Sequence, residues 1–174
     1  KVVDEDGRIT IPHFYDKVDE VPAAEREMIA QIPFDEQKYM DAIGVKQLKG
    51  EKGYSTLERN SCRPSFDVCG IWGGYTGEGS KTVLPSKAYA KVSCRLVPHQ
   101  DHETISQLFI DYINSIAPEY VQVKVTPMHG GEGYVCPITL PAYQAAEKGF
   151  TKAFGKKPLA VRRGGSIPII SDFE

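Results

Sequence analysis

Long apolar runs are absent from this sequence of 174 residues, and nothing in it approaches the roughly 18 apolar residues of a membrane-spanning helix. The first residues, KVVDEDGRIT, lack the apolar core of a signal peptide and an initiating Met. We therefore expect the chain to begin within a longer protein or after processing. The formal net charge is only −2, so nothing in the charge balance favours a nucleic acid or an anionic membrane as a partner.

Cysteine is scarce, and the four cysteines are Cys62, Cys69, Cys94 and Cys136. No two of them form a CxxC motif, and none has a His at the spacing of a zinc ligand, which removes the patterns typical of a structural zinc site. Their spacing does not indicate a disulfide framework either. We expect all of them to be reduced and the protein to be cytoplasmic.

The middle of the chain has the alternation typical of half-buried strands. A first strand is expected in SFDVCGI, from Ser65, and a second in KAYAKVSCRLV, from Lys87. The apolar face of the second strand would hold Ala88, Ala90, Val92, Cys94 and Leu96, and its polar face Lys87, Tyr89, Lys91, Ser93 and Arg95. The stretch between the two strands, GGYTGEGSKTVLP, is rich in Gly and reads as a turn.

A helix and a further strand follow. Apolar residues recur at helical spacing over 101–116, with Asp101 as the N-cap, and YVQVKVTPM places Val121, Val123 and Val125 on one side of a strand. The order strand, strand, helix, strand predicts an α+β fold of ferredoxin-like type, in which helices cover one face of an antiparallel sheet.

Three more helices are expected outside this region. Two short amphipathic helices occupy 22–32 and 33–44, and a longer one runs over 141–155. The last helix has no sheet of its own to pack against. We therefore expect its apolar face to belong to a body of structure outside this chain.

Few stretches have the pattern of a functional site. GYTGEGSKT is similar to a phosphate-binding loop, but Lys81 comes one place late and a strand pattern follows instead of a helix, so a plain turn is favoured. His99 and His102 flank a helix start, and a solvated helix entry is the simpler reading. For Arg95, on a polar strand face, both a solvated charge and a functional role remain open, as they do for His129 in HGG. Gly164–Ser166, in RRGGSIP, is either a plain loop or a nest for an anion.

Taken in order, GIWGGYTGEGSKTVLPSKAYAKVSCRLVP, HGG and RRGGSIPI resemble the carnosinase-type branch of the dinuclear zinc peptidases. Relatives in that superfamily include aminoacylase, carboxypeptidase G and succinyl-diaminopimelate desuccinylase. The resemblance implies a lid that is also the dimerisation domain, with an antiparallel four-stranded sheet and helices on one face. On this basis residues 1–133 are the lid, and 134–174 are a strip of the catalytic domain.

The resemblance also implies roles for particular residues. Thr82 of KTVLP matches a threonine that approaches the substrate from the neighbouring subunit, and Arg95 of RLVP matches the arginine that holds the substrate carboxylate. His129 matches a histidine near that carboxylate, while Gly165 and Ser166 match a loop that supplies a backbone N–H and a hydroxyl. His13 matches no motif.

The zinc ligands and the catalytic base implied by the resemblance have no counterpart in this sequence. Two zinc ions, held by residues outside this chain, would activate water and polarise the amide carbonyl. We therefore expect a homodimeric dipeptidase as the full-length protein and no activity from this chain alone. Two alternatives remain open: an amidase or deacylase acting on N-acyl amino acids, and a non-catalytic dimerisation module.

Overall fold

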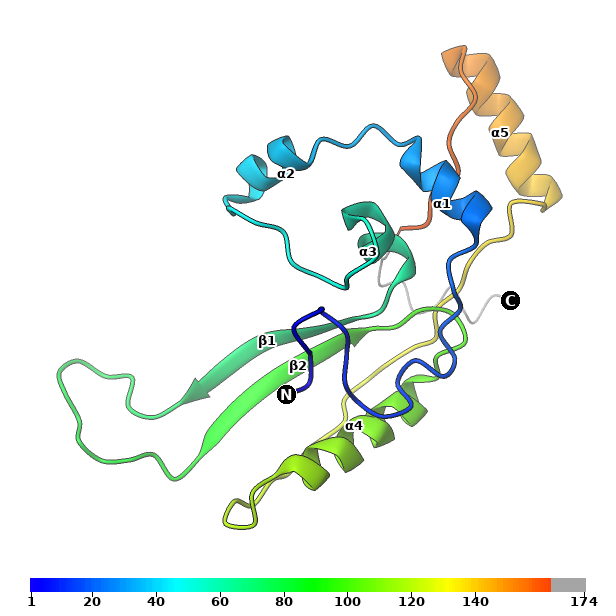
Figure 1. Cartoon of the computed structure of the whole chain (residues 1–174). Helices are drawn as coiled ribbons and strands as arrows, with labels where there is room; N and C mark the ends of the chain where they lie inside the picture. Colours follow the sequence, from blue (N-terminus) through cyan, green and yellow to red (C-terminus); the bar gives the residue numbers. More distant parts are fainter. Residues whose placement is uncertain (164–174) are drawn as a thin grey trace.

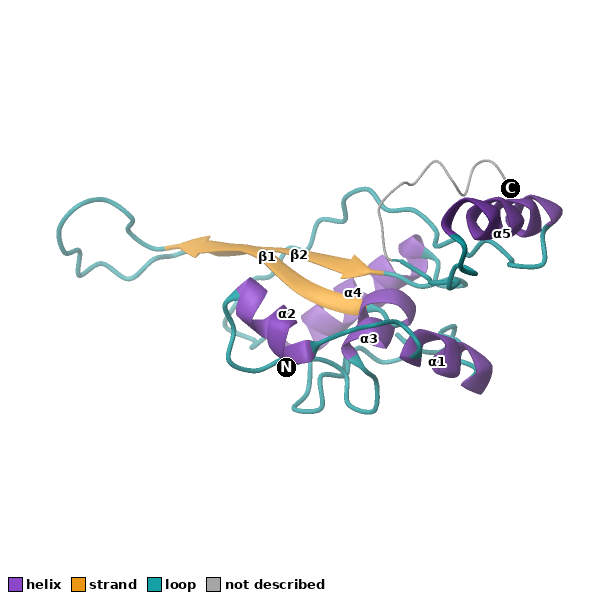
Figure 2. Cartoon of the chain, turned by 90° about the horizontal axis from the view of Figure 1, so that it is seen from above, coloured by secondary structure: helices purple, strands orange, loops and turns teal. Residues whose placement is uncertain are grey.

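The computed structural model describes residues 1–163, and residues 164–174 lie outside the described part. In chain order the elements are α1 (Ala23–Ala30), α2 (Glu36–Ile43), α3 (Thr56–Cys62), β1 (Ser65–Gly73), β2 (Ala88–Arg95), α4 (His102–Ile116) and α5 (Pro141–Phe154). Figure 1 shows β1 and β2 as a long hairpin with α4 beside one half of it and the connecting loop projecting away. Helices α1 to α4 lie on the same side of this hairpin (Figure 2). The predicted α+β class is confirmed.

Most helices begin and end at their sequence signals. The Asp101 carboxylate accepts the Thr104 N–H at 2.7 Å and starts α4, and these hydrogen bonds lower the pKa of Asp101. Sequence reasoning missed α3, although its signal is present. Ser55 and Glu58 form a capping box, in which each side chain accepts the other residue's backbone N–H. None of the helices within residues 1–163 combines the length and apolar character that a membrane crossing requires.

The hairpin is antiparallel, and its register confirms the predicted alternation of β2. Phe66 lies opposite Cys94 and Val68 opposite Val92, which places these four side chains on one face. A bulge between Val68 and Gly70 interrupts the ladder, and pairing then resumes as far as Gly73. Beyond the bulge the apolar face is largely uncovered, because the hairpin extends past α4 (Figure 1).

The four-stranded sheet is not confirmed. Within residues 1–163 the sheet has two strands, β1 and β2, and the stretch Val121–Val125 belongs to none. Its alternating valines are present as expected, but no described strand lies beside it to form a hydrogen-bonded ladder. Alternation in the sequence indicates which face of a strand is apolar. It does not show which other strand will pair with it.

The core lies between the N-terminal segment, the hairpin base and α4. Ile9, Ile11, Phe14 and Ile105 are buried together. Phe66 of β1 meets Phe109 of α4 with ring centroids 5.8 Å apart. Buried Gln100 connects the N-terminal segment to the chain just before α4. Its side chain donates a hydrogen bond to the Phe14 carbonyl at 2.8 Å and accepts one from the Val97 N–H at 3.1 Å.

A second cluster joins the N-terminal segment to α3 and α1. We call it the Arg–Tyr stack. Its guanidinium carbons and ring centroids are 3.9 Å apart for Arg8 and Tyr15, 5.3 Å for Arg63 and Tyr15, 4.4 Å for Arg63 and Tyr54, and 4.7 Å for Arg26 and Tyr54. Each of these contacts is a cation–π arrangement. Because its members come from four separate stretches of chain, the stack fixes those stretches relative to one another.

An ion pair between Arg63 and Glu51 lies in the middle of this stack. Arg63 Nε and Nη2 each donate to one carboxylate oxygen of Glu51 at 2.8 Å, and only 5% of Arg63 and 8% of Glu51 are exposed. Burial by itself would lower the pKa of Arg63, but the hydrogen bonds and the charge of Glu51 outweigh it, and the pKa is raised.

Gly7 marks a close backbone contact between the first turn and the loop before α3. Its φ is +77°, and a Cβ there would lie 2.4 Å from the Gly50 carbonyl carbon, a backbone atom that cannot swing away. In the full-length protein we expect Gly7→Ala to lower the free energy of unfolding by about 2–4 kcal/mol, from left-handed strain plus overpacking. A urea unfolding curve measures this change.

The matched control is Gly53→Ala. Gly53 has a φ of +87°, but nothing lies within 4 Å of its would-be Cβ. This substitution should cost only the strain, about 1–2 kcal/mol. Equal destabilisation by the two substitutions would contradict the close contact at Gly7.

Candidate functional site

Arg95 is the last residue of β2, and its neighbours determine the direction of its side chain. Cys94 and Leu96, on either side of it, pack against the core, so Arg95 lies on the opposite face of the strand. Burial, with a smaller contribution from Asp67, raises the pKa of the Cys94 thiol to about 11, so Cys94 acts as an apolar core residue. The structure therefore places Arg95 on the polar face, as predicted.

The HGG segment lies against the connection from β2 to α4. A Cβ on Gly130 would be 2.6 Å from His102 Cγ, and one on Gly133 would be 3.0 Å from the backbone of Val97 and Pro98. These close approaches leave little room for a side chain at Gly130 or Gly133, and they place residues 129–133 at the hairpin base. His129 is exposed at this end of the hairpin, which is also the end at which Arg95 lies.

Thr82 lies at the other end of the hairpin. It is in the loop that connects β1 to β2, which projects away from the helices in both views (Figures 1 and 2). At about 3.4 Å per residue, β2 alone separates this loop from Arg95 by roughly 24 Å. A dipeptide is much shorter than this, so Thr82 and Arg95 of one chain do not reach the same small ligand.

Two of the predicted site residues, Gly165 and Ser166, lie outside the described residues. The chain that leads to these residues is described as far as Arg163, and it passes along α1. Arg162, in this approach, forms an ion pair with Glu25 of α1. Nothing in the sequence indicated this pairing, because the two residues are 137 positions apart and match no shared motif.

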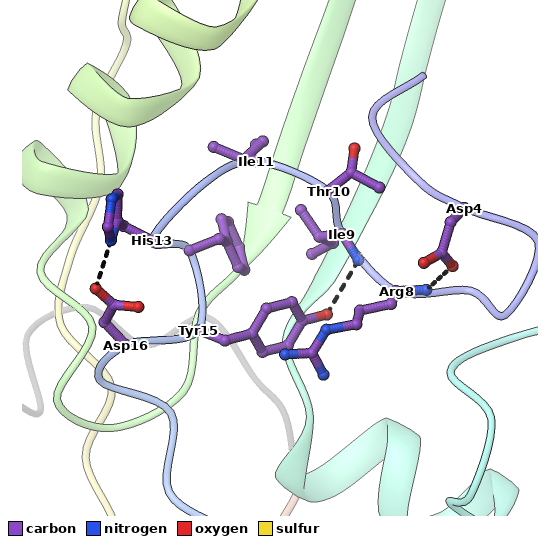
Figure 3. A pocket seen from close by; sticks show the side chains of 9 residues that line it. Asp4, Arg8, Ile9, Thr10, Ile11, His13, Tyr15 and Asp16 are labelled. Atoms are coloured by element: carbon purple, nitrogen blue, oxygen red, sulfur yellow. Dashed lines mark hydrogen bonds and ion pairs between the residues drawn. The ribbon is translucent and has the colours of Figure 1, made fainter.

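A shallow cavity of about 360 Å³ lies in the bend of the N-terminal segment (Figure 3). Its polar groups are bonded to one another: His13 Nδ1 lies 2.8 Å from Asp16 Oδ2, Asp4 accepts the Arg8 N–H at 2.8 Å, and the Tyr15 hydroxyl accepts the Ile9 N–H at 3.1 Å. None of the five predicted site residues lines this cavity. It offers no group poised for chemistry, and His13 acquires no role from it.

Within residues 1–163, no group of three or more His, Cys, Asp and Glu side chains is arranged to hold a metal ion. All four cysteines are free, and burial raises the pKa of the Cys62 thiol. The described residues therefore do not fit a dinuclear zinc centre.

The described residues form an α+β fold, and comparison with known proteins gives the family to which this fold belongs. The sequence profile of the peptidase dimerisation domain of the M20 family matches residues 12–121. The chain belongs to this family.

Individual relatives match along nearly the whole chain. This chain is 29% identical over 177 residues to a Cys-Gly metallodipeptidase of Schizosaccharomyces pombe, and the match covers 99% of this chain and 37% of that protein. Among solved structures, an M20 family metallo-carboxypeptidase from Sulfolobus solfataricus superposes with a TM-score of 0.83 at 29% identity, over 97% of this chain and 38% of that one. Human carnosine dipeptidase 1 superposes with a TM-score of 0.80 at 27% identity, over 99% of this chain and 37% of that one. The chain thus spans little more than a third of the length of these relatives.

Proposed function

We propose that this chain is the lid and dimerisation part of a zinc-dependent peptidase that hydrolyses dipeptides or short peptides with a free C-terminal carboxylate. The observation that carries this proposal is the position of Arg95. Arg95 lies on the strand face opposite Cys94 and Leu96, at the hairpin base where the HGG segment also lies. The relatives are a metallodipeptidase, a carnosine dipeptidase and a metallo-carboxypeptidase, and substrates of this kind end in a carboxylate.

In this proposal the chain binds and orients the substrate. A planar guanidinium can donate two parallel N–H bonds to a carboxylate, so Arg95 would hold the C-terminal end. His129 would stand near the same carboxylate, while Gly165 and Ser166 would add a backbone N–H and a hydroxyl. The two zinc ions would supply the hydrolytic chemistry from residues outside this chain. Fixing the substrate terminus sets the position of the scissile bond.

The separation of Thr82 from Arg95 favours a homodimer. If Thr82 contributes to a site that contains Arg95, it must come from a second copy, because about 24 Å of β2 separates the two residues within one chain. In a two-fold dimer each copy would then give its hairpin loop to the other's site. The loop is suited to reaching outward, since Val83 and Leu84 beside Thr82 are 70% and 88% exposed.

We propose further that the complete lid has the four-stranded sheet that the resemblance implies. Within residues 1–163 β2 pairs only with β1, so its second edge is available to a strand from the rest of the polypeptide. Val121 and Val123 are exposed and alternate in the way a strand requires. We also propose that the lid ends at residue 133, that residues 134–174 belong to the catalytic domain, and that the protein is cytoplasmic.

The full-length protein should be assayed with zinc on three substrates: a free-acid dipeptide, its C-terminal amide, and an N-acyl amino acid. We expect the free-acid dipeptide to be cleaved, a chelator to abolish cleavage, and the amide to be a poor substrate. The 174-residue chain by itself should hydrolyse none of them. Preference for the N-acyl amino acid would favour the amidase alternative, and activity that survives removal of metal would refute the proposal.

A further inference from the structure

Helix α4 begins with His102, and this residue lies against the HGG segment, residues 129–131. A Cβ on Gly130 would be 2.6 Å from His102 Cγ, 2.7 Å from its Cβ and 2.8 Å from its Nδ1. Since a Cβ is about 1.5 Å from its Cα, the Gly130 Cα is within about 4.1 Å of His102 Cγ and already in contact with it. Gly130 does not have a positive φ, so the contact with His102, and not the backbone conformation, excludes a side chain.

The start of α4 is a fixed support for this contact. The Asp101 carboxylate accepts hydrogen bonds from the Thr104 N–H at 2.7 Å and from the Thr104 hydroxyl at 2.6 Å. Ile105, in the first turn of α4, is buried in the core. The His102 Cβ moves only with this backbone, whereas rotation about χ1 can displace Cγ and Nδ1. A methyl group on Gly130 would therefore displace the HGG segment and not the helix.

The chain just after the HGG segment is held at a second point. A Cβ on Gly133 would be 3.0 Å from Pro98 N and 3.0 Å from the Val97 carbonyl carbon, both backbone atoms. The chain that follows α4 runs back beside the helix to reach this place (Figure 1). Val97 is buried and comes two residues after Arg95. The short connection that supports residues 129–133 thus begins at Arg95 and ends at His102.

We propose that His102 is a positioning residue for His129. The Cα atoms of His129 and Gly130 are about 3.8 Å apart, so the support under Gly130 sets where His129 leaves the backbone. Helix α4 thereby fixes His129 relative to the end of β2, where Arg95 lies. This inference rests on the proposed function, because it assumes that His129 stands near the substrate carboxylate.

Displacement of His129 and a general loss of folded enzyme predict different kinetics. Loss of folded enzyme lowers kcat for every substrate by the same factor. Displacement of a group that binds the carboxylate instead raises KM and lowers kcat/KM for substrates that have the carboxylate, and it leaves the C-terminal amide nearly unchanged.

The test uses the full-length enzyme with Gly130→Ala, His102→Gly, the two combined, and His129→Ala as the reference. We expect Gly130→Ala to lower kcat/KM for the free-acid dipeptide by about 10- to 100-fold, mainly through KM, as misplacement by about 1 Å can do. His102→Gly alone should lower it by less than about 10-fold, since the support is lost without a clash. His129→Ala should show the same selectivity for the free acid over the amide.

The combined variant gives the sharpest result. His102→Gly removes the atoms that the new methyl group would meet, so it should raise kcat/KM of the Gly130→Ala enzyme by about 3- to 10-fold, although it is harmful alone. His102→Ala should rescue less, because its Cβ stays 2.7 Å from the methyl position. The matched control is His99→Gly, three residues earlier, because His99 is exposed and pairs with Asp19. His99→Gly should neither rescue Gly130→Ala nor change the kinetics of the wild type.

A second readout does not depend on activity. Gly130→Ala should lower the urea midpoint of unfolding, and adding His102→Gly should raise it again. Equal losses on the free acid and the amide, failure of His102→Gly to rescue either measurement, or equal rescue by His99→Gly would overturn the positioning role alone. If the wild type cleaves neither substrate, or if His129→Ala has no selective effect, that part of the proposed function fails and this inference fails with it.

Discussion

Arg95→Ala in the full-length enzyme should lower kcat/KM for a free-acid dipeptide by roughly 30- to several-thousand-fold. The reason is that in the substrate complex the proposed pair of Arg95 and the carboxylate is shielded from water, and removing one partner of such a pair typically costs about 2–5 kcal/mol. The same change should cost the fold only about 0–1 kcal/mol, because Arg95 lies on the face opposite the core and is exposed. Steady-state kinetics and a urea unfolding curve on the same preparation measure the two effects.

Two controls test whether Arg95 holds a carboxylate. Arg95→Lys should recover only part of the activity, since a point charge cannot make two parallel hydrogen bonds. The C-terminal amide should be a poor substrate for the wild type and should be little affected by Arg95→Ala. If Arg95→Ala impairs the amide and the free acid equally, Arg95 does not bind the carboxylate.

Arg95→Ala also tests whether one site combines Arg95 of one copy with Thr82 of the other. If Thr82 and Arg95 of one site come from different copies, a heterodimer of Thr82→Ala and Arg95→Ala chains contains one site with both defects and one intact site. Random mixing of the two variants should therefore give about a quarter of the wild-type activity from mixed dimers, because about half of the dimers are mixed and each has one intact site in two. No restoration after verified subunit exchange would place Thr82 outside the Arg95 site.

Local signals in the sequence predicted most of the helices correctly. Helix α4 begins after Asp101, as its N-cap and apolar spacing indicate, and α5 occupies the predicted stretch. Helix α3 was overlooked because it has only seven residues, although the Ser55–Glu58 capping box was readable. These features depend on residues a few positions apart, which is why one sequence is enough to find them.

The features that depend on distant residues were harder to predict. The valines at 121–125 show the alternation of a strand, but strand pairing needs a neighbour, and residues 1–163 do not provide one. Alternation alone placed Arg95 on the polar face of its strand. Its separation from Thr82 depends on the full length of the hairpin, which the sequence pattern does not give. No local pattern relates Glu25 to Arg162 or Glu51 to Arg63, because each contact is made only when separate segments fold together.

The pair between Glu51 and Arg63 leads to the largest expected effect on stability. Arg63→Met should lower the free energy of unfolding by about 3–5 kcal/mol, because it leaves Glu51 buried without the guanidinium that satisfies both of its oxygens. The loss should lie toward the lower end, since Arg8 Nη1, at 3.4 Å from Glu51 Oε1, offers partial compensation. A urea unfolding curve of the full-length protein measures the change.

A neighbouring pair provides the control for this prediction. Lys52 follows Glu51 directly and meets Asp6 at 3.3 Å, but both side chains are mostly exposed, so Lys52→Met should cost less than about 1 kcal/mol. The double variant Glu51→Gln with Arg63→Met should be more stable than the sum of the single losses predicts, because no unpaired buried charge remains. If Arg63→Met costs no more than Lys52→Met, the Arg–Tyr stack does not hold the N-terminal segment to α3, and the core around Phe14 and Gln100 must do so alone.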